Sequence, residues 1–552
     1  MKLKTLTEYL SHWNDACPDK IWLRDLKESG SEDVTWGEAH RQISSMAAIL
    51  EQKFGHAKRM VVLSQNRAHW VLADLAIITS GNITVSLFTT LPASTAKYII
   101  DFTEATVFFI GEASNWESVR EILPKGATLI TLPGVHIDEP HLQWDEIVSE
   151  PPLTKIAHKS IPDDVISLVF TSGTTGNPKG VIQTHESNII PVQRFIDSVG
   201  FSSQEIRYFS YLPLAHIAER QIVEFSSLLL CGEIFFNESI DTLARDLPIC
   251  RPNVFFGPPR IWEQLQQAII GKFGGQEAFD AAMEQDKEGI GQLVLQTLGL
   301  DKVEYCLAAA APTPPPLIAW WESLGLLLME GFGQTEAMGL IVSTKEERRL
   351  GSIGKPIGEV EYRITEENEL VVKADGCTPG YYLQAEKTAE LIRDGWLYTG
   401  DKVRVDEDGF IYITGRVKDY FKTIHGKFVA PVPIEGKFAE NSFVEQQCLL
   451  GRGFSKTVMI GVLTDEAQSK STSEIEDSIK ESVISINLEQ EKHAHIGAVI
   501  LSKEAWSVEN EVLTPTMKIR RDRVEEQFGV QAEDLARTAA EAGELLVIWD
   551  SG

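Results

Sequence analysis

Short apolar runs alternate with longer helical patterns along the first 160 residues. Met60 to Leu63 and Ala105 to Ile110 are apolar runs of strand length, and Gly37 to Glu51 has the pattern of a helix. Strands that alternate with helices are joined by crossover connections, which favours a parallel sheet. Ile166 to Phe170 continues the pattern as a short apolar strand that runs directly into a glycine-rich loop. We therefore predict an α/β fold for this part of the chain.

Strand patterns become shorter later in the chain. Glu369 to Lys373 and Phe410 to Thr414 alternate as in a smaller, partly antiparallel sheet. Gly409 to Gly426 mixes glycine with basic residues, which is typical of a domain boundary. We therefore predict a large N-terminal domain, residues 1–415, and a smaller C-terminal domain, residues 416–552.

The predicted C-terminal domain has its own pattern. Pro431 and Pro433 open a stretch that reads helix, strand, helix, strand, helix. The last segment, Asp534 to Gly552, has an Ala/Glu-rich helical pattern followed by the apolar run Leu545 to Trp549. We expect this segment to be a tail that docks on the surface, and its sequence indicates no chemistry.

The composition limits the classes of function. A chain of 552 residues is too long for one ordinary core, and its 43% hydrophobic and 24% charged residues are typical of a folded globular protein. The net charge of -29 makes the average surface repel a phosphate backbone, which argues against nucleic acid as a partner. A site for a phosphate-bearing ligand must therefore be a local cluster of donors.

Cysteine usage and apolar runs bear on the compartment. The six cysteines form no C-x-x-C pair and no metal-ligand spacing, so we expect a reducing cytoplasm. Met1 to Leu10 has no continuous apolar core, and the run Leu228 to Phe236 is far shorter than the roughly 20 residues that span a bilayer. We expect no export signal, no transmembrane helix and at most peripheral membrane contact. Both a monomer and a homodimer stay open.

The segment from Thr171 to Gly180 carries the strongest motif of the chain. It reads Thr-Ser-Gly-Thr-Thr-Gly-Asn-Pro-Lys-Gly and follows the predicted strand directly. Its glycines let the backbone approach an anion, its hydroxyls donate hydrogen bonds and Lys179 adds positive charge. The spacing does not fit the Walker pattern G-x-x-x-x-G-K-[ST]. Short loops of this composition are usually surface hairpins, but the position after a buried strand favours a phosphate site.

With this loop the chain resembles the adenylate-forming superfamily of acyl-CoA synthetases, luciferases and peptide-synthetase adenylation domains. Four later motifs match that family in order: Gly331-Phe332-Gly333-Gln334-Thr335-Glu336, Tyr398-Thr399-Gly400-Asp401, Gly415-Arg416-Val417-Lys418-Asp419 and Thr514-Pro515-Thr516-Met517-Lys518-Ile519-Arg520-Arg521. The resemblance implies an α/β fold with a large N-terminal domain of layered α/β subdomains and a small β-barrel-like part. It also implies a smaller, mobile α+β C-terminal lid domain.

The resemblance implies that the protein binds ATP, Mg2+ and coenzyme A. It assigns the phosphates to Thr171, Ser172, Gly173, Thr174, Gly176 and Lys179, and it places Thr175 among the catalytic residues. The adenine motif contributes Phe332, Gly333, Gln334 and Thr335. Phe332 can stack on the base, and Glu336 is the implied Mg2+ ligand because a hard cation needs oxygen ligands. Read alone, these two would be a core aromatic residue and an exposed carboxylate.

Four charged residues complete the implied machinery. By the resemblance, Asp401 accepts the ribose hydroxyls and Arg416 completes the ribose contact or reaches phosphate oxygens. Lys518 is the implied catalytic lysine, because an ammonium beside the attacked α-phosphate stabilises the transition state more than the ground state. Lys418 is the implied pivot about which the C-terminal domain rotates between two half-reactions. Read alone, these residues would be a turn aspartate, a surface arginine and solvated lysines.

The acyl substrate is indicated by less specific motifs. Tyr211 to Arg220 and Gly257 to Glu263 look most like long-chain fatty acyl-CoA synthetases, which implies a fatty acid substrate. The resemblance places His216 where the acyl and thiol channels meet, and Ala309 and Ala310 beside the adenylate. An apolar set could line a tunnel, although such residues are more often ordinary core; its members are Phe225, Leu228, Leu229, Leu230, Phe235 and Phe236.

Two departures from the family pattern affect this interpretation. Ala308 to Ala311 stands where many relatives have one or two glycines, and the added methyl groups put the acyl chain length in doubt. Phe332 replaces a frequent tyrosine, which removes a hydroxyl but keeps the ring face.

The resemblance thus implies an AMP-forming ligase that activates a fatty acid as acyl-AMP and transfers the acyl group to coenzyme A. One alternative is a ligase on the same fold that stops at acyl-AMP or loads an acyl carrier protein. Another is a catalytically silent sensor of nucleotide or acyl-AMP. The intact Lys518, Glu336, Asp401 and Arg416 argue against the sensor, because binding alone does not need the transition-state lysine.

Overall fold

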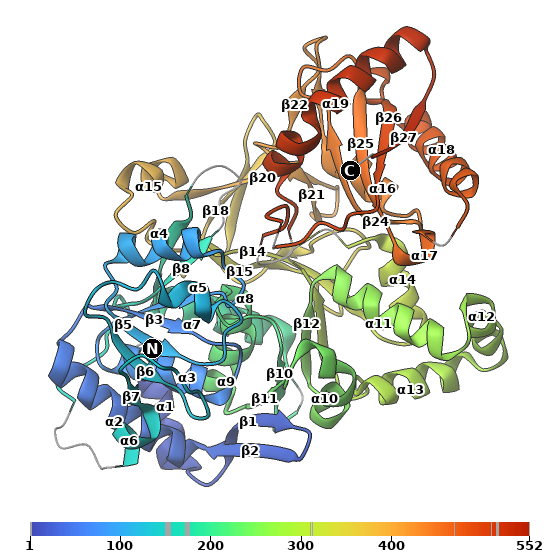
Figure 1. Ribbon diagram of the computed structural model, residues 1–552. Coiled ribbons are helices and arrows are strands. Elements are labelled where there is room, and N and C mark those ends of the chain that lie inside the picture. Colours follow the sequence, from blue (N-terminus) through green and yellow to red (C-terminus); the bar gives the residue numbers. More distant parts are fainter. Residues whose placement is uncertain are drawn as a thin grey trace. The chain divides into compact units, whose positions relative to one another are not determined.

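The computed structural model divides the chain into two compact units (Figure 1). It describes residues 3–149, 156–171, 177–201, 203–309, 311, 313–468, 470–508, 510–514 and 518–550. Unit 1 comprises the described residues of 1–173, 177–362 and 372–397, and unit 2 comprises those of 363–371 and 398–552. Strands β18 (Glu369–Lys373) and β20 (Trp396–Val405) each contain one of these boundaries.

A seven-stranded sheet forms the first layer of unit 1. Its strand order is β7 (Leu142–Gln143), β6 (Thr128–Thr131), β5 (Val107–Ile110), β3 (Arg59–Leu63), β4 (Ile83–Leu87), β8 (Val165–Thr171) and β9 (Lys179–Thr184). All neighbouring strands are parallel except β8 and β9, which form an antiparallel hairpin at the edge. The parallel sheet predicted from the crossover pattern is confirmed.

A nine-stranded sheet forms the second layer. Its order is β16 (Lys355–Pro356), β15 (Ala337–Val342), β14 (Leu328–Gln334), β13 (Tyr305–Ala308), β12 (Val254–Gly257), β10 (Arg207–Ser210), β11 (Glu233–Phe236), β1 (Ile21–Lys27) and β2 (Gly30–Thr35). Strands β10 to β14 pair in parallel, and antiparallel hairpins flank them at both ends. Strands β1 and β11 are parallel neighbours although more than two hundred residues separate them in sequence.

The core of unit 1 joins the two sheets through helices. One buried cluster contains Met60 and Ile166 from the first sheet and Leu23 and Ile234 from the second, together with apolar side chains of α2 and α3. The helices of unit 1 are α1 (Leu6–Ala16), α2 (Trp36–Phe54), α3 (Ala68–Thr79), α4 (Ala93–Thr103), α5 (Trp116–Arg120), α6 (Trp144–Ser149), α7 (His185–Val199), α8 (Ile217–Glu219), the π-helix η1 (Arg220–Phe225), α9 (Ser226–Leu230), the 3-10 helix η2 (Ile240–Thr242), α10 (Leu243–Cys250), α11 (Pro259–Lys272), α12 (Gln276–Gln285), α13 (Lys287–Leu298), α14 (Pro315–Ser323) and α15 (Ala385–Leu391).

Helix α7 shows how local sequence positions an element beside the first sheet. Thr184 caps its start by accepting a hydrogen bond from the Ser187 N–H, and the Ser187 hydroxyl accepts one from the Thr184 N–H. Pro191 lies inside the helix and has no N–H to donate to the Ser187 carbonyl. Gln221 of η1 donates to that carbonyl at 3.3 Å instead. The irregular helix η1 thereby satisfies a group that the proline leaves free.

Two smaller sheets follow the large ones. A five-stranded sheet has the order β17 (Glu361–Ile364), β18, β20, β19 (Ile392–Arg393), with β21 (Ile411–Arg416) also paired to β20 in an antiparallel manner. It corresponds to the smaller, partly antiparallel region expected from the sequence. The short strands β22 (Phe421–Lys422) and β23 (Phe428–Val429) form a separate hairpin.

The remainder of unit 2 is an α+β fold around a four-stranded sheet. The strand order is β24 (Val444–Leu450), β25 (Thr457–Leu463), β26 (Ile496–Ser502) and β27 (Leu546–Trp549). The helices are α16 (Pro431–Phe438), α17 (Asp465–Gln468), α18 (Thr472–Glu489), the 3-10 helix η3 (Lys492–Ala494) and α19 (Arg521–Ala542). Apolar clusters pack on both faces of the sheet, one against α16 and α18 and the other against α19.

Two expectations for this region were wrong. The stretch after Pro431 has two strands, β24 and β25, between its first helices where the pattern predicted one. The final segment is not a surface tail, because β27 pairs in parallel with β26, and Ala536 and Ala539 of α19 are buried. The side chains of its apolar run, Leu545 to Trp549, pack alternately against the clusters on the two faces of the sheet.

No helix among the described residues is long and apolar enough to cross a membrane.

Candidate active site

The β8–β9 hairpin positions both ends of the predicted phosphate loop. Thr171 and Lys179 face each other in the pair of residues nearest the loop. The loop residues Ser172, Gly173, Thr174, Thr175 and Gly176 lie outside the described residues. The Lys179 ammonium lies 4.7 Å from the centre of the Tyr381 ring, a cation–π contact that restrains the lysine at the end of the loop.

The β14–β15 hairpin carries the predicted adenine motif. Phe332 pairs with Ile341 and is 8% exposed, so only a small part of the residue is open to a stacked base. Gly333 is exposed, whereas Gln334 and Thr335 are half-buried. Gln183 of β9 donates from Nε2 to the Thr335 carbonyl at 2.7 Å. This hydrogen bond joins the adenine motif to the strand that leaves the phosphate loop.

Glu336 is held by a segment that sequence analysis did not identify. The Tyr381 hydroxyl donates a hydrogen bond to Glu336 Oε1 at 2.6 Å, and the Thr378 N–H donates to the Glu336 carbonyl at 2.8 Å. One phenol therefore contacts both Glu336 and Lys179. The only available signal was the Pro379-Gly380 turn followed by two tyrosines, which does not by itself indicate a partner.

Residues 378–382 reach this position by pairing with β9. The Ile182 N–H donates to the Gly380 carbonyl at 3.0 Å, and the Tyr382 N–H donates to the Gly180 carbonyl at 2.8 Å. These bonds cover the outer edge of the hairpin and fix the direction of the Tyr381 side chain. The backbone of three separated segments thus brings Lys179, Glu336 and Tyr381 together.

Glu330 of β14 immediately precedes Gly331, the first residue of the predicted adenine motif. It is 8% exposed and accepts a hydrogen bond from the Gly351 N–H at 3.1 Å. Burial raises the pKa of its carboxyl to about 8, despite the opposing effect of that hydrogen bond. At neutral pH the group is therefore largely protonated, and it adds little negative charge behind the motif.

The segment Tyr211 to Arg220 forms a turn and the start of a helix. His216 is half-buried and caps α8, because its Nδ1 accepts a hydrogen bond from the Ala218 N–H at 3.2 Å. Glu219 is buried and accepts from the Ser210 hydroxyl at 2.8 Å and the Tyr211 N–H at 3.1 Å. Burial raises the pKa of Glu219 to about 8.

Arg220 anchors this segment inside unit 1. Its side chain is fully buried and forms ion pairs with Asp74 and, at 3.1 Å, with Glu224. Nη1 also donates to the Ser167 hydroxyl of β8 at 2.7 Å. Burial and the neighbouring Asp74 hold the pKa of Glu224 well above its usual range. The arginine therefore connects the His216 segment to the strand that enters the phosphate loop.

Apolar side chains lie next to these motifs. One cluster combines Phe195 of α7 with Ala218, Leu307 and Met329, and both Ala309 and Met338 pack against it. Ala310, the other predicted residue of this strand end, lies outside the described residues. The cluster also contacts Phe201, which lines a cavity of about 440 Å³.

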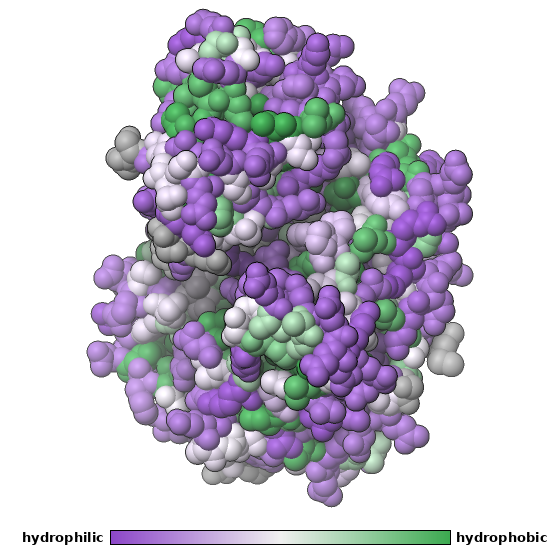
Figure 2. All heavy atoms as spheres, turned by 90° about the vertical axis from the view of Figure 1, so that its right-hand side faces the viewer, coloured by the Kyte–Doolittle hydropathy of each residue, from purple (hydrophilic) through white to green (hydrophobic). Residues whose placement is uncertain are grey.

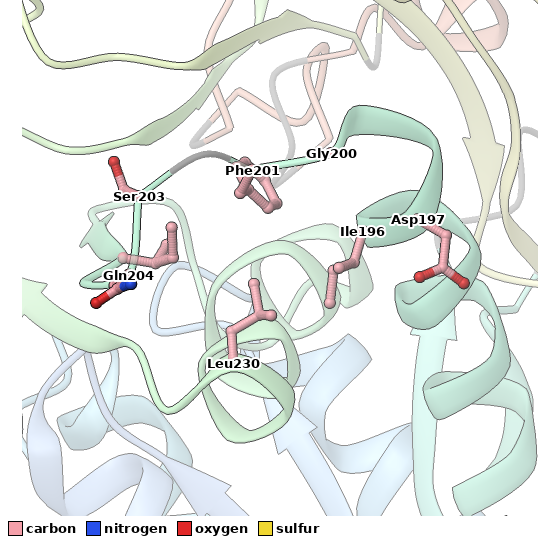
Figure 3. Close-up of a pocket in the computed structure, with 8 residues that line it drawn as sticks. Ile196, Asp197, Gly200, Phe201, Ser203, Gln204 and Leu230 are labelled. Carbon is pink, nitrogen blue, oxygen red and sulfur yellow. The ribbon is translucent and has the colours of Figure 1, made fainter.

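The cavity lies between the end of α7 and the end of α9. In Figure 3 the side chains of Ile196, Phe201 and Leu230 point toward one another inside it, while Ser203 and Gln204 lie at its side. Most of the apolar set proposed from the sequence, including Phe225 and Leu228, is instead packed in the core clusters of unit 1. The ordinary interpretation as core therefore applies to those residues, and Leu230 alone of the set lines the cavity.

The predicted ribose residues are neighbours in unit 2. Asp401 of β20 and Arg416 of β21 face each other across the antiparallel pair, and Arg416 Nε lies 3.1 Å from Asp401 Oδ1. The Asp401 side chain is 6% exposed and that of Arg416 48% exposed. Thr399 supports the turn, because its hydroxyl accepts from the Asp401 N–H at 3.1 Å. The pair presents one fixed carboxylate and one guanidinium that can move.

The two predicted lysines of unit 2 lie in different local structures. Lys418 is exposed in a turn between β21 and β22, where the Asp419 N–H donates to the Arg416 carbonyl at 3.1 Å. Lys518 is exposed just before α19, and its N–H donates to the Thr514 hydroxyl at 3.0 Å. The Thr514 N–H donates back to the Lys518 carbonyl at 2.8 Å, so two hydrogen bonds join these residues.

In the described part of the chain, protein side chains alone do not form a Mg2+ site. No group of three or more His, Cys, Asp or Glu side chains there could hold a metal ion. Glu336 has one carboxylate oxygen occupied by Tyr381 at 2.6 Å. Mg2+ commonly binds through one or two carboxylates together with substrate phosphates, so a single carboxylate beside a phosphate loop fits a metal that arrives with a nucleotide.

Family models match most of the sequence. A model described as AMP-binding enzyme matches residues 10–382, and a model described as AMP-binding enzyme C-terminal domain matches residues 418–539. Among curated relatives, a long-chain-fatty-acid–CoA ligase of Mycobacterium bovis is 28% identical and covers 94% of both chains. The peroxisomal long chain acyl-CoA synthetase 6 of Arabidopsis thaliana is 29% identical over 90% of this chain and 80% of its own length.

A solved structure shares the fold. The adenylation domain of a carboxylate reductase from Mycobacterium chelonae superposes with a TM-score of 0.80 at 20% identity. The match covers 97% of this chain and 91% of that chain. The fold predicted from the resemblance, with a large N-terminal α/β part and a smaller C-terminal part, is confirmed.

Proposed function

The chain belongs to the AMP-binding enzyme family, and from that premise we propose that it is an ATP-dependent ligase joining a long-chain fatty acid to coenzyme A. The observation that carries the proposal is the Glu336 carboxylate, held at 2.6 Å by Tyr381 beside the hairpin of the phosphate loop. The curated relatives that are named as long-chain ligases support the choice of acid.

The proposed reaction has two balanced steps. A carboxylate oxygen of the acid attacks the α-phosphorus of ATP, the bond to the bridging oxygen breaks, and pyrophosphate leaves. The product is acyl-AMP. The thiol sulfur of coenzyme A then attacks the acyl carbon, its proton passes to solvent, and AMP leaves with the electron pair of the carbon–oxygen bond.

Unit 1 contributes the proposed phosphate and metal contacts. Lys179 places a positive charge at the end of the phosphate loop, where it offsets charge on the leaving pyrophosphate. Glu336 would hold Mg2+, which when bound neutralises phosphate charge. Tyr381 donates to one Glu336 oxygen, so the other oxygen would be available as a ligand. It acts as a positioning residue for Glu336.

Unit 2 contributes the proposed ribose and transition-state contacts. Asp401 accepts hydrogen bonds from the ribose hydroxyls, and Arg416 is available for phosphate or ribose oxygens. Lys518 stabilises the negative charge that develops at the attacked α-phosphate. We propose Lys418 as the pivot between the half-reactions and retain the boundary between residues 415 and 416 as the edge of the moving part. A cytoplasmic location stays a prediction from cysteine usage.

The acyl chain is proposed to follow the apolar cluster from Ala309 and Met338 to the cavity beside Phe201. Apolar contacts along that line favour a long hydrocarbon chain, with each buried CH2 contributing about 0.8 kcal/mol. Ile196 and Leu230 would then contact the end of the chain. The described residues at the cavity include one carboxylate, Asp197, and in Figure 3 its side chain points away from the three apolar side chains.

The test is an assay of pyrophosphate release with ATP, Mg2+ and straight-chain acids of increasing length. We expect release to increase with length up to a long-chain optimum and acyl-CoA to form when coenzyme A is added. A matched variant, Ile196→Trp, should shift the optimum to shorter acids because it fills the cavity. A best acid shorter than six carbons would refute the long-chain substrate. Acyl-AMP without transfer to coenzyme A would instead favour a ligase for a carrier protein.

A further inference from the structure

Two cysteine thiols lie in contact within unit 1. The Cys17 and Cys231 sulfurs are 3.3 Å apart although 214 residues separate them in sequence, and both thiols are free. The sulfur–sulfur distance in a disulfide is about 2.0 Å, so the two atoms need to approach by about 1.3 Å to form one. The pair is therefore close to the arrangement from which a disulfide forms.

Both cysteines end a helix. Cys17 follows α1, and Cys231 follows α9 with a φ of 53°, in the left-handed region that glycine usually occupies at this position. A residue with a side chain is disfavoured there, and such backbone conformations are concentrated at functional sites and switches. In this chain the disfavoured position holds a thiol that contacts a second thiol.

Hydrogen bonds hold the two helix ends together on both sides of the thiol pair. Trp13 Nε1 donates to the Leu228 carbonyl at 2.6 Å, and Lys20 Nζ donates to the Cys231 carbonyl at 2.8 Å. One of these donors precedes Cys17 in sequence and the other follows it. The contact between the sulfurs is therefore fixed by the surrounding fold and does not depend on the thiols alone.

The two thiols differ in their access to solvent. Cys17 is half-buried between the exposed residues Ala16 and Pro18, whereas Cys231 is 8% exposed. Burial and the hydrogen bond with Cys17 raise the pKa of Cys231 to about 12, so this thiol stays protonated at neutral pH. A small oxidant from solvent therefore reacts with Cys17 first, and Cys231 is in contact with the product.

We propose that Cys17 and Cys231 form a reversible disulfide when the protein meets a hydroperoxide. With hydrogen peroxide, the Cys17 thiolate attacks one oxygen, the O–O bond breaks, and hydroxide leaves and takes up the Cys17 proton. The Cys231 sulfur then attacks the sulfur of the Cys17 sulfenic acid and the S–O bond breaks. The departing hydroxide takes the Cys231 proton. Two thiols thus lose two electrons and two protons, and the peroxide becomes two molecules of water.

A bond within the chain is favoured over a bond between two chains. The face of the molecule in Figure 2 is covered mostly by hydrophilic side chains, and the net charge of -29 makes two copies repel each other. Cys231 is already in contact with Cys17, so its effective concentration exceeds that of a thiol on another copy. In a reducing compartment such a bond would be transient, which is typical of redox-sensing disulfides.

The test is a peptide map of the reduced full-length protein after treatment with hydrogen peroxide, alkylation of the remaining thiols and digestion with trypsin. Cleavage after lysine and arginine puts Cys17 and Cys231 in separate peptides, 5–20 and 221–245, which contain no other cysteine. We expect the two peptides to be joined and two hydrogens lighter than their combined mass. Two of the six thiols should resist alkylation until dithiothreitol is added.

Matched variants separate the two steps. Cys231→Ser should leave Cys17 as a sulfenic acid that dimedone traps, because the second thiol is missing. Cys17→Ser should lose the linked peptide and leave Cys231 without a dimedone adduct. Cys377→Ser removes another half-buried thiol and should form the link as wild type does.

Unfolding in urea provides a second readout. The bond closes a loop of more than two hundred residues, so oxidation should raise the unfolding midpoint of wild type and leave that of Cys231→Ser unchanged. Six alkylated thiols after peroxide treatment would overturn the proposal, because the sulfurs would then only pack together. So would a link from Cys17 to a different cysteine, or a wild-type Cys17 sulfenic acid that persists. None of these readouts depends on ligase activity.

Discussion

The Tyr381 hydroxyl donates to the Glu336 carboxylate at 2.6 Å, although 45 residues separate the two in sequence. The same ring lies 4.7 Å from the Lys179 ammonium. The neutral phenol of Tyr381 thus orients both the Glu336 carboxylate, through a hydrogen bond, and the Lys179 ammonium, through its ring. Small changes at Tyr381 therefore test whether Glu336 needs a fixed direction.

Tyr381→Phe should slow pyrophosphate exchange roughly 10- to 100-fold. It removes one hydrogen bond to a charged group, worth about 1.5 to 3 kcal/mol, and keeps the ring that contacts Lys179. The Mg2+ concentration for half-maximal rate should rise, because Glu336 loses its orientation. Tyr382→Phe is the matched control and should behave as wild type. An unchanged rate and Mg2+ dependence in Tyr381→Phe would remove the tyrosine from the site.

Arg220→Met should destabilise the protein by about 3 to 5 kcal/mol, because it leaves the buried Asp74 carboxylate without its cation and removes the donor that Glu224 accepts from. Urea unfolding followed by circular dichroism measures this loss. Adding Asp74→Asn and Glu224→Gln to Arg220→Met should recover much of it, since no buried charge then remains unpaired. If the triple variant is as unstable as Arg220→Met, packing rather than charge explains the effect.

Glu219 should make stability depend on pH. Its pKa is raised from 4.5 to about 8 in the folded protein, so the folded state keeps a proton that the unfolded chain releases. The contribution is fully present below pH 4.5 and is lost as the pH rises through about 8. Glu219→Gln should therefore reduce the fall in stability between pH 5 and pH 8.5. Glu330 retains a similar shift, so part of the fall should persist.

Lys518→Ala and Lys418→Pro should fail in different half-reactions. Lys518→Ala should lose acyl-AMP formation by roughly 10²- to 10³-fold, the scale of one lost transition-state donor, and still convert supplied acyl-AMP. Lys418→Pro restricts φ at the proposed pivot, so it should form acyl-AMP and transfer the acyl group poorly. Pyrophosphate exchange and transfer from synthetic acyl-AMP measure the two steps. Equal losses in both steps for both variants would contradict the separate roles.

Asp401→Ala should weaken ATP binding by about 1 to 3 kcal/mol, because it removes the acceptor for the ribose hydroxyls. Asp401 also accepts from Arg416 at 3.1 Å, a contact that an amide oxygen can keep and a methyl group cannot. Asp401→Asn keeps an acceptor and should lose less than Asp401→Ala. Isothermal titration with ATP measures both. Equal affinities for wild type and Asp401→Ala would exclude the ribose role.

Most of the fold could be predicted because it depends on local patterns. Glu369 to Lys373 was predicted as a strand and is β18, and the predicted strand Ile166 to Phe170 differs from β8 by one residue at each end. Apolar periodicity and turn residues determine such elements from within. The motifs likewise show which residue types meet a nucleotide, although their roles here stay predictions.

Partners that are distant in sequence could not be predicted. Arg220 looked like one residue of an acyl motif, yet its partner Asp74 lies 146 residues earlier. The sequence around Tyr381 does not indicate its partners. They follow from the pairing of residues 378–382 with β9. The run Leu545 to Trp549 has the pattern of a strand, but whether it pairs depends on the free edge of β26. Which remote segments pair depends on the order in which the strands and helices are arranged in space, and local sequence patterns do not contain that order.

The pairing of residues 378–382 with β9 also has a consequence for biosynthesis. The Thr378 hydroxyl donates to the Ile182 carbonyl across 196 residues. While a ribosome makes the chain, β9 emerges long before the segment that covers it, so its outer edge stays open for the time needed to synthesise those residues. If the first sheet has folded at this stage, the backbone groups on the outer edge of β9 have no partner strand. Until residues 378–382 are made and pair with β9, this edge can pair with other chains, which makes the nascent protein prone to aggregation in that interval.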